Sequence, residues 1–137
     1  MCGIAGALGP VVPDEGKIAR TLGCMRHRGP DAHGWQRAEL RGQPLTLLHS
    51  RLSIIDLDER SNQPFAVDGC TLVFNGEIYN YLELRHDLKR RGQVFETESD
   101  TEVVIKAYLE FGLEFVERME GMWAFALFDE SEQVLIL

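Results

Sequence analysis

The segment from residue 121 to residue 137, GMWAFALFDESEQVLIL, constrains the fold of this chain most. It contains two apolar runs separated by a polar stretch from Asp129 to Glu132. Apolar runs joined by such a turn predict a β-hairpin, and therefore an antiparallel sheet. The final run, VLIL, has the composition of a strand interior, so we expect this domain to be incomplete at its C-terminus, with a parent protein that continues past Leu137.

Three other apolar stretches are strand candidates. They are residues 2–8 (CGIAGAL), 44–55 (PLTLLHSRLSII) and 70–78 (CTLVFNGEI). Apolar side chains dominate all of them, as is typical of strands with buried faces. The segment from Asp56 to Asp68 is polar and predicts a loop.

Helical spacing or helix-end signals mark residues 16–29, 80–92, 99–112 and 113–119. The first of these helices is expected to end at Gly29-Pro30. Asn80 is the predicted N-cap of the second helix. Ser99 and Glu102 have the S-x-x-E spacing of a capping box at the start of the third.

Strands and helices follow one another in mixed order, and strand–turn–strand connections occur. This order predicts an α+β fold in which helices cover antiparallel sheets, rather than a doubly wound parallel sheet. The length of 137 residues fits one domain with a substantial core. No GxGxxG sequence or phosphate-binding P-loop is present.

Composition excludes several classes of function. The formal net charge of -8 disfavours binding to nucleic acid. No apolar run approaches the roughly 20 residues that cross a bilayer, and the N-terminus lacks the features of a signal peptide, so we expect a cytoplasmic protein. The scattered cysteines do not indicate a disulfide framework. His27 and His33 share a loop, but without further ligands they do not predict a metal site.

Cys2 is the first candidate for chemistry, because the chain opens MCGIAG. Methionine aminopeptidases remove Met1 when the second side chain is small, which would leave Cys2 with a thiol and a free α-amine. Their reference pKa values, about 8.5 and about 7.7–8.0, are closely matched. One residue would then supply both nucleophile and base. The alternative is a buried strand cysteine without a role.

Asn75-Gly76 in FNGEIYN follows an apolar run. An amide NH₂ beside a backbone N–H on a residue without a side chain provides the two donors of an oxyanion hole. Asn-Gly is also a common hairpin turn, but here the chain passes into a helical pattern and not into a return strand.

Arg51 and Asp100 are candidates for binding charge. Arg51 ends an apolar strand, where a guanidinium suits a carboxylate, although an ordinary salt bridge would explain it equally. Asp100 lies in the acidic stretch TESDTE, where helix capping is the alternative explanation. One arginine with one aspartate is chemically matched to a free α-amino acid.

The ordered set MCGIAG, RHRGPD, HSRLSIID, QPF, FNGEIYN, ESDTE and GMWAFALFD resembles the N-terminal glutaminase domain of the asparagine synthetase family, an N-terminal-nucleophile (Ntn) amidotransferase domain. The resemblance implies a four-layer αββα sandwich. It implies Cys2 as nucleophile, Asn75 and Gly76 as oxyanion donors, and Arg51 on the glutamine carboxylate.

The same resemblance implies further site residues. Asp100 and Glu77 would hold the glutamine ammonium, and Leu52 and Ile54 would shape the pocket. The loop beside the nucleophile would order the site. Its residues are Arg26, Arg28, Gly29, Pro30 and Asp31.

For the parent protein, the resemblance implies that ammonia passes to a C-terminal ATP-dependent synthetase domain that amidates aspartate. That domain would use ATP and Mg²⁺, it is absent from this chain, and residues 1–137 need no cofactor or metal of their own. A homodimer is possible. The alternatives are the same domain serving a sugar, peptide or antibiotic-precursor amidotransferase, or a catalytically silent glutaminase-like module.

Overall fold

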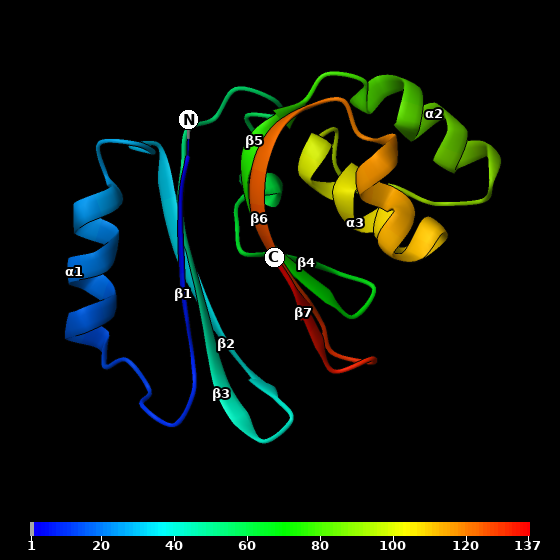
Figure 1. The fold of residues 1–137 in the computed structure, drawn as a ribbon. Helices are drawn as coiled ribbons and strands as arrows, with labels where there is room; N and C mark the ends of the chain where they lie inside the picture. The colour runs from blue at the N-terminus through cyan, green and yellow to red at the C-terminus, as the bar shows by residue number, and fades with distance from the viewer. Residues whose placement is uncertain (1) are drawn as a thin grey trace.

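Two antiparallel sheets stacked face to face form the middle of the molecule, with helices on both outer sides (Figure 1). The computed structural model describes residues 2–137. Its elements are β1 (Gly3–Leu8), α1 (Glu15–Met25), β2 (Ala32–Leu40), β3 (Gln43–Arg51), η1 (Glu59–Ser61), β4 (Phe65–Val67), β5 (Cys70–Ile78), α2 (Tyr81–Arg90), α3 (Asp100–Phe111), η2 (Gly112–Arg118), β6 (Gly121–Asp129) and β7 (Val134–Ile136).

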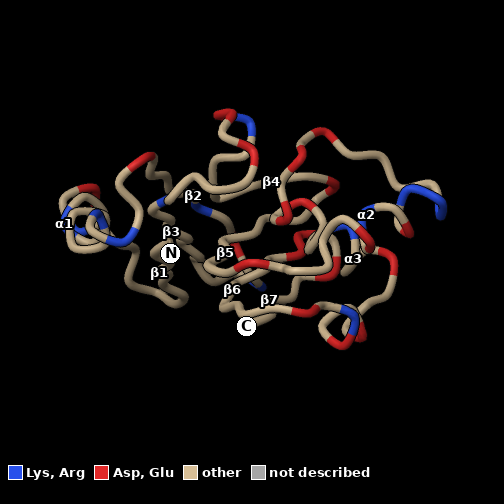
Figure 2. The backbone as a smooth tube through the Cα atoms, turned by 90° about the horizontal axis from the view of Figure 1, so that it is seen from above, with Lys and Arg blue, Asp and Glu red and all other residues tan. Residues whose placement is uncertain are grey.

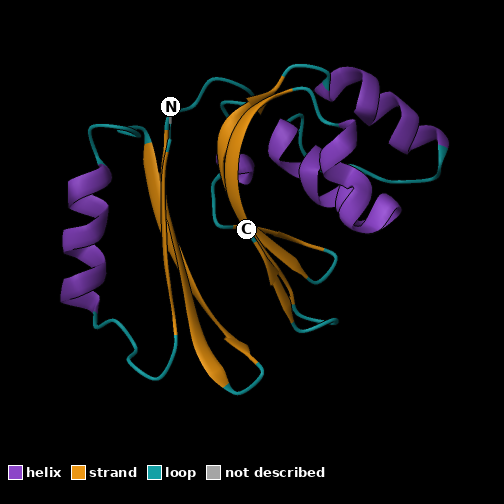
Figure 3. Cartoon of the chain, in the orientation of Figure 1, coloured by secondary structure: helices purple, strands orange, loops and turns teal. Residues whose placement is uncertain are grey.

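The sheet orders are β1-β3-β2 and β4-β5-β6-β7, and all the pairings are antiparallel. Helix α1 covers the first sheet, and α2 and α3 cover the second (Figure 3). The predicted α+β sandwich of four layers is therefore confirmed. The hairpin predicted over residues 121–137 is β6 and β7.

Apolar side chains fill three layers, one of which lies between α1 and the first sheet around Ile18, Leu22 and Leu48. The largest core lies between the second sheet and its helices, where Phe115 is fully buried against the rings of Tyr108 and Phe125. Another layer lies between the sheets, where β3 meets β5 and β6 around residues such as Leu47 and Val73. Fully burying one such side chain contributes about 1.5–3 kcal/mol. The central strands β3 and β5 read as continuous apolar runs because both of their faces are covered.

Two strands, β2 and β4, were not predicted from the sequence. Strand β2 is at the edge of its sheet, and one of its faces is open to solvent. Exposed residues therefore alternate along it with partly buried ones, and most of the partly buried ones are small or polar. Strand β4 is only three residues long and lies inside the segment predicted as a loop. The strand predicted over 44–55 ends at Arg51, and the chain then leaves the sheet.

The predicted helix ends need correction. Helix α1 ends at Met25, not at Gly29-Pro30, because the backbone turns through Arg28 and Gly29 onto the Met25 carbonyl. Asn80 precedes α2 without capping it, since its side chain bonds the backbone of Arg118 and Glu120.

The capping box at α3 is half correct. Ser99 accepts a hydrogen bond from the N–H of Thr101, as an N-cap should. The carboxylate of Glu102 reaches past Ser99 and accepts from the N–H groups of Glu96 and Thr97 instead. It therefore orders the segment before the helix.

Charges are unevenly distributed. Basic residues lie on α1 and at the end of α2, whereas acidic residues predominate around β4, β5 and α3 (Figure 2). Within residues 2–137, no helix has the length and apolar character needed to cross a membrane.

Candidate active site

A pocket opens where β1 begins, β3 ends and α3 begins, at one end of the paired sheets. Its wall combines a thiol, one basic group, two carboxylates and a free strand edge. The lining residues are Cys2, Arg51, Leu52, Ile54, Ile55, Ser61, Gln63, Phe74, Gly76, Glu77, Ser99, Asp100 and Thr101.

Cys2 directly precedes β1, and the pairing of Gly3 with Ser50 places it beside the end of β3. Its Sγ lies 3.4 Å from the backbone nitrogen of Leu52 and 3.7 Å from the Leu52 carbonyl oxygen. The side chain is half-buried and borders the pocket. The expected removal of Met1 lies outside the described residues.

The loop predicted to order the nucleophile packs against it. The Nε of Arg28 donates to the carbonyl of Cys2 at 2.9 Å. Gly29 has no room for a side chain, because a Cβ there would lie 2.2 Å from the Ser50 carbonyl oxygen. Asp31 receives the N–H of Ser53 at 2.8 Å. The loop thus joins the start of β1 to the end of β3.

The other two residues of that loop lie elsewhere. Arg26 and Pro30 are exposed and border a groove between α1 and β2, not the pocket. The structure does not bring their side chains to Cys2.

The backbone of β5 presents Gly76 at a free strand edge. Phe74 and Ile78 direct their N–H groups away from β6, onto the side chains of Gln63 (2.6 Å) and Asp100 (3.3 Å). Gly76 lies two residues from each of them along the strand. Because every second residue of a strand directs its N–H to the same edge, the N–H of Gly76 also points away from β6, into the pocket. Strand β4 pairs with β5 only from Cys70 to Leu72 and leaves this edge open.

Gly76 must be glycine for a reason the sequence did not show. A Cβ at Gly76 would lie 2.3 Å from the Met122 carbonyl oxygen of β6, so the missing side chain makes room for the neighbouring strand. Asn75 is half-buried just outside the pocket lining, and its Oδ1 has no hydrogen-bond partner within the described part of the chain.

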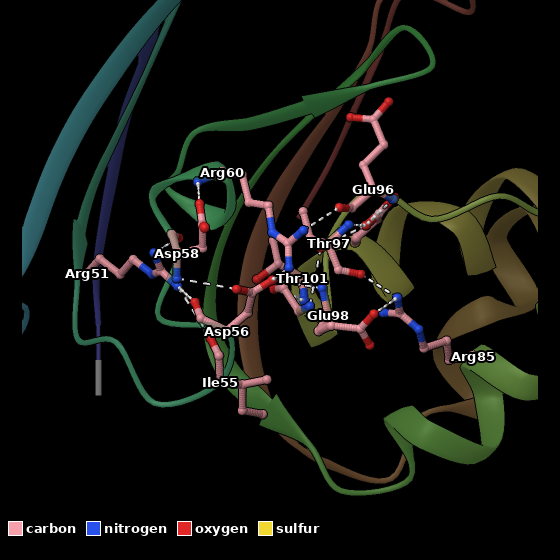
Figure 4. A network of polar contacts seen from close by, with 12 residues as sticks. Arg51, Ile55, Asp56, Asp58, Arg60, Arg85, Glu96, Thr97, Glu98 and Thr101 are labelled. Carbon is pink, nitrogen blue, oxygen red and sulfur yellow. Dashed lines mark hydrogen bonds and ion pairs between the residues drawn. The ribbon is translucent and has the colours of Figure 1, made fainter.

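Arg51 is buried at the pocket wall with 5% of its surface exposed. Its guanidinium donates to the carbonyls of Ile55, Asp56 and Asp58 and to the Asn62 side chain (Figure 4). None of its partners within residues 2–137 is a carboxylate, so its positive charge is hydrogen-bonded but not neutralised.

Asp100 and Glu77 line the same pocket. Burial raises the pKa of Asp100 above its ordinary value; the N–H groups of Ile78 and Thr101 oppose this rise, and the Glu77 carboxylate adds to it. Two acidic groups that disfavour each other's charge suit a cation between them.

Leu52 and Ile54 also line the pocket, although Ile54 is more than half exposed. Gln63 belongs to the QPF motif, and the sequence predicted no role for it. It is buried, accepts from Phe74 and donates to the Thr101 hydroxyl at 3.3 Å. Within residues 2–137, no group of three or more His, Cys, Asp or Glu residues could hold a metal ion.

Comparisons with known proteins agree on one kind of domain. A family model described as "Glutamine amidotransferase domain" matches residues 1–137. A putative glutamine-hydrolysing asparagine synthetase of Mycobacterium tuberculosis is 44% identical over 94% of this chain and 22% of its own length. Asparagine synthetase 1 of Bacillus subtilis is 37% identical over 98% of this chain and 22% of its own.

Two further matches widen the comparison. A Gibberella zeae protein named Amidase chry2 is 37% identical over 99% of this chain and 22% of its own length. The solved structure of the glutamine phosphoribosylpyrophosphate amidotransferase from B. subtilis superimposes with a TM-score of 0.68 at 18% identity, over 92% of this chain and 35% of that one. That last likeness concerns the fold.

Proposed function

Because the chain belongs to the glutamine amidotransferase domain family, we propose that it hydrolyses glutamine to glutamate and ammonia, with Cys2 as the nucleophile. The observation that carries the proposal is one pocket that gathers Cys2, the free N–H edge at Gly76, Arg51 and Asp100. A nucleophile, an oxyanion donor and both charges of an amino-acid binding site meet there.

Glutamine is oriented by its α-amino acid end. The carboxylate pairs with the Arg51 guanidinium, whose charge has no protein counter-ion in the described chain. The ammonium lies by Asp100 and Glu77 and relieves their mutual repulsion. The side-chain amide then extends toward Cys2.

Bond making and breaking follow from that pose. The α-amine of Cys2 takes the thiol proton, and Sγ attacks the amide carbon. Negative charge develops on the amide oxygen and is met by the Gly76 N–H and the Asn75 amide. The protonated amine gives its proton to the nitrogen, the C–N bond breaks and ammonia leaves. Water then cleaves the thioester and releases glutamate and the thiol.

The parent protein extends this reaction. The chain spans 22% of the length of the asparagine synthetases from M. tuberculosis and B. subtilis that it matches. We place an ATP-dependent, Mg²⁺-using synthetase domain in the remainder, receiving ammonia and amidating aspartate. Residues 1–137 need no cofactor in this scheme. A cytoplasmic location and a homodimer belong to the same proposal.

A second candidate keeps the glutaminase and changes the acceptor to a sugar, a peptide or an antibiotic precursor. The match to Amidase chry2, whose name specifies no synthetase, favours keeping this candidate. Product analysis of the parent protein with glutamine, ATP and aspartate separates the two. Asparagine supports the first candidate, and ammonia release without asparagine supports the second.

The glutaminase itself is tested by intact mass after treatment with an electrophilic glutamine analogue. Cys24 is exposed and would also react, so the test uses a Cys24→Ser background. We expect loss of Met1 and a single adduct that excess glutamine prevents. The same chain carrying Cys2→Ser is the control and should gain no adduct and release no ammonia. Labelling that persists in the Cys2→Ser control, or that glutamine does not block, contradicts the assignment and favours a silent module.

A further inference from the structure

The loop that leaves β3 after Arg51 forms one side of the pocket, through Leu52, Ile54 and Ile55. It folds back so that its carbonyl groups surround the Arg51 guanidinium. The position of that guanidinium therefore depends on the position of the loop. The central carbonyl of this set belongs to Asp56.

The side chain of Asp56 fastens the loop to a distant part of the chain. Its Oδ2 accepts the N–H of Glu98, 42 positions away, at 2.7 Å (Figure 4). The same oxygen lies 3.3 Å from Nη2 of Arg60. The Asp56 side chain is only 5% exposed, whereas the Arg60 side chain is 50% exposed. The bond to Glu98 is the shorter of the two contacts.

Glu98 lies two positions before Asp100 in the segment that leads into α3. Asp100 in turn accepts the N–H of Ile78 from β5. Arg60 provides one link between the loop that carries Arg51's acceptors and the segment that carries Asp100, because its Nη1 donates to the Glu96 carbonyl at 3.1 Å. The Asp56 side chain provides another, through its bond to Glu98. The two charged ends of the pocket come from separate layers, and this bond connects them.

The backbone of Asp56 is held in the left-handed region, with a φ of 49°. Aspartate adopts this conformation more readily than most residues, but it remains unfavourable for an L side chain. The strain is maintained at a position whose carbonyl bonds Arg51 and whose carboxylate bonds Glu98. The carbonyl and the carboxylate of Asp56 therefore both accept hydrogen bonds in this conformation.

From these contacts we infer that Asp56 is a positioning residue for glutamine binding. Its backbone carbonyl aims Arg51 at the substrate carboxylate, and its side chain fixes the distance from Arg51 to Asp100. This inference rests on the proposed glutaminase function. Asp56 does not touch Cys2, so it acts on substrate binding and leaves the thiol chemistry alone.

The test uses the parent protein and two substitutions suited to the left-handed backbone. Asp56→Gly keeps the carbonyl and removes the carboxylate without adding strain. Asp56→Asn keeps an oxygen that can accept from Glu98 and loses only the charge. Asp87→Asn is the matched control, because Asp87 is an ion-paired aspartate on the exposed face of α2.

Glutamine KM and kcat for ammonia release, and inactivation by iodoacetamide, are measured for each. Asp56→Gly should raise KM by roughly tenfold or more while kcat stays within about twofold. Asp56→Asn should recover most of that loss, and Asp87→Asn should match the parent. Iodoacetamide should inactivate all the variants at similar rates, because Cys2 is unaltered.

The outcomes distinguish a failure of the role of Asp56 from a failure of the proposed glutaminase function. A parent protein that shows no saturable glutamine hydrolysis overturns both. A parent that hydrolyses glutamine while Asp56→Gly keeps the parental KM overturns the role of Asp56 alone. Equal loss of kcat in Asp56→Gly and Asp56→Asn, with slowed iodoacetamide inactivation, overturns it too, because a general loss of structure would then explain the effect.

Discussion

Asp100 and Arg51 are both buried, and neither forms an ion pair within residues 2–137. An unpaired buried charge is costly, typically several kcal/mol per ion before compensation. Backbone groups hydrogen-bond both side chains, and the Asn62 side chain also accepts from Arg51, but none of these neutral partners removes the net charges. The pocket is therefore arranged for a ligand that brings one charge of each sign, at the expense of the stability of the empty protein.

Asp100→Asn makes this trade-off measurable. The amide keeps an oxygen for the Ile78 N–H but removes the carboxylate that burial and Glu77 disfavour. A raised folded-state pKa destabilises the fold at neutral pH, so the variant should melt at a higher temperature than the parent. Glutamine KM should rise by roughly tenfold or more as the ammonium loses its partner. A lower melting temperature with an unchanged KM would remove Asp100 from the pocket.

Residue type and order were enough to nominate Cys2, Gly76, Arg51 and Asp100 as candidates, although each also had an ordinary structural explanation. Glu77, Leu52 and Ile54 came only from family resemblance. The partners of Arg51 could not be predicted, since carbonyl groups carry no sequence signal. Asp56 was missed for a related reason: its contact with Glu98 spans 42 positions.

At the scale of elements, β5 has two different functions on its two edges. One edge pairs with β6 along the whole strand. The other pairs with β4 only as far as Leu72 and then turns its N–H groups toward Gln63, the pocket and Asp100. The shortness of β4 is what exposes the N–H of Gly76. A longer β4 would cover the pocket with an ordinary sheet edge.

Gly76→Ala should damage this strand. Its Cβ would press on the Met122 carbonyl, so β5 and β6 must separate locally, at a cost of about 1–3 kcal/mol. We expect a lower urea midpoint and a loss of glutamine hydrolysis. Gly23→Ala on α1 is the control, because a Cβ there meets nothing within 4 Å. That helical substitution should stabilise by about 0.5–1 kcal/mol. Equal midpoints for the two variants would contradict the crowding at Gly76.

The elements that the sequence predicted well are those with strong apolar patterns, namely β5, α3 and the β6–β7 hairpin. Edge strand β2 was missed because its inward positions are small or polar, such as Gly34 and Gln36. Gly34 must be small because Gln63 crosses it, and a Cβ would lie 2.6 Å from the Gln63 carbonyl oxygen. That requirement comes from a tertiary contact and leaves no periodic pattern in β2.

At the scale of the whole molecule, the two sheets are joined mainly by apolar contacts and by a few polar ones. The most buried polar contact is His49 of β3, whose Nε2 lies 3.0 Å from the Phe74 carbonyl oxygen of β5. A carbonyl can only accept, so Nε2 carries the proton. Nδ1 is buried and has no partner in the described chain. The ring is therefore held neutral between the sheets.

This buried ring predicts how the sandwich responds to acid. Burial lowers the pKa of His49 to about 4; the bond to Phe74 opposes the shift, and Arg51 adds to it. The unfolded chain therefore binds the proton first as pH falls below about 6.5, and stability is lost between there and about pH 4. The full shift corresponds to roughly 3 kcal/mol in the free energy of unfolding.

His49→Gln keeps a neutral donor and cannot titrate, so its urea midpoint should fall much less than that of the parent over this range. Asp100 and the other carboxyls titrate in both proteins and cancel in the comparison. Parallel pH profiles for the two proteins would show that acid does not act on the sandwich through His49.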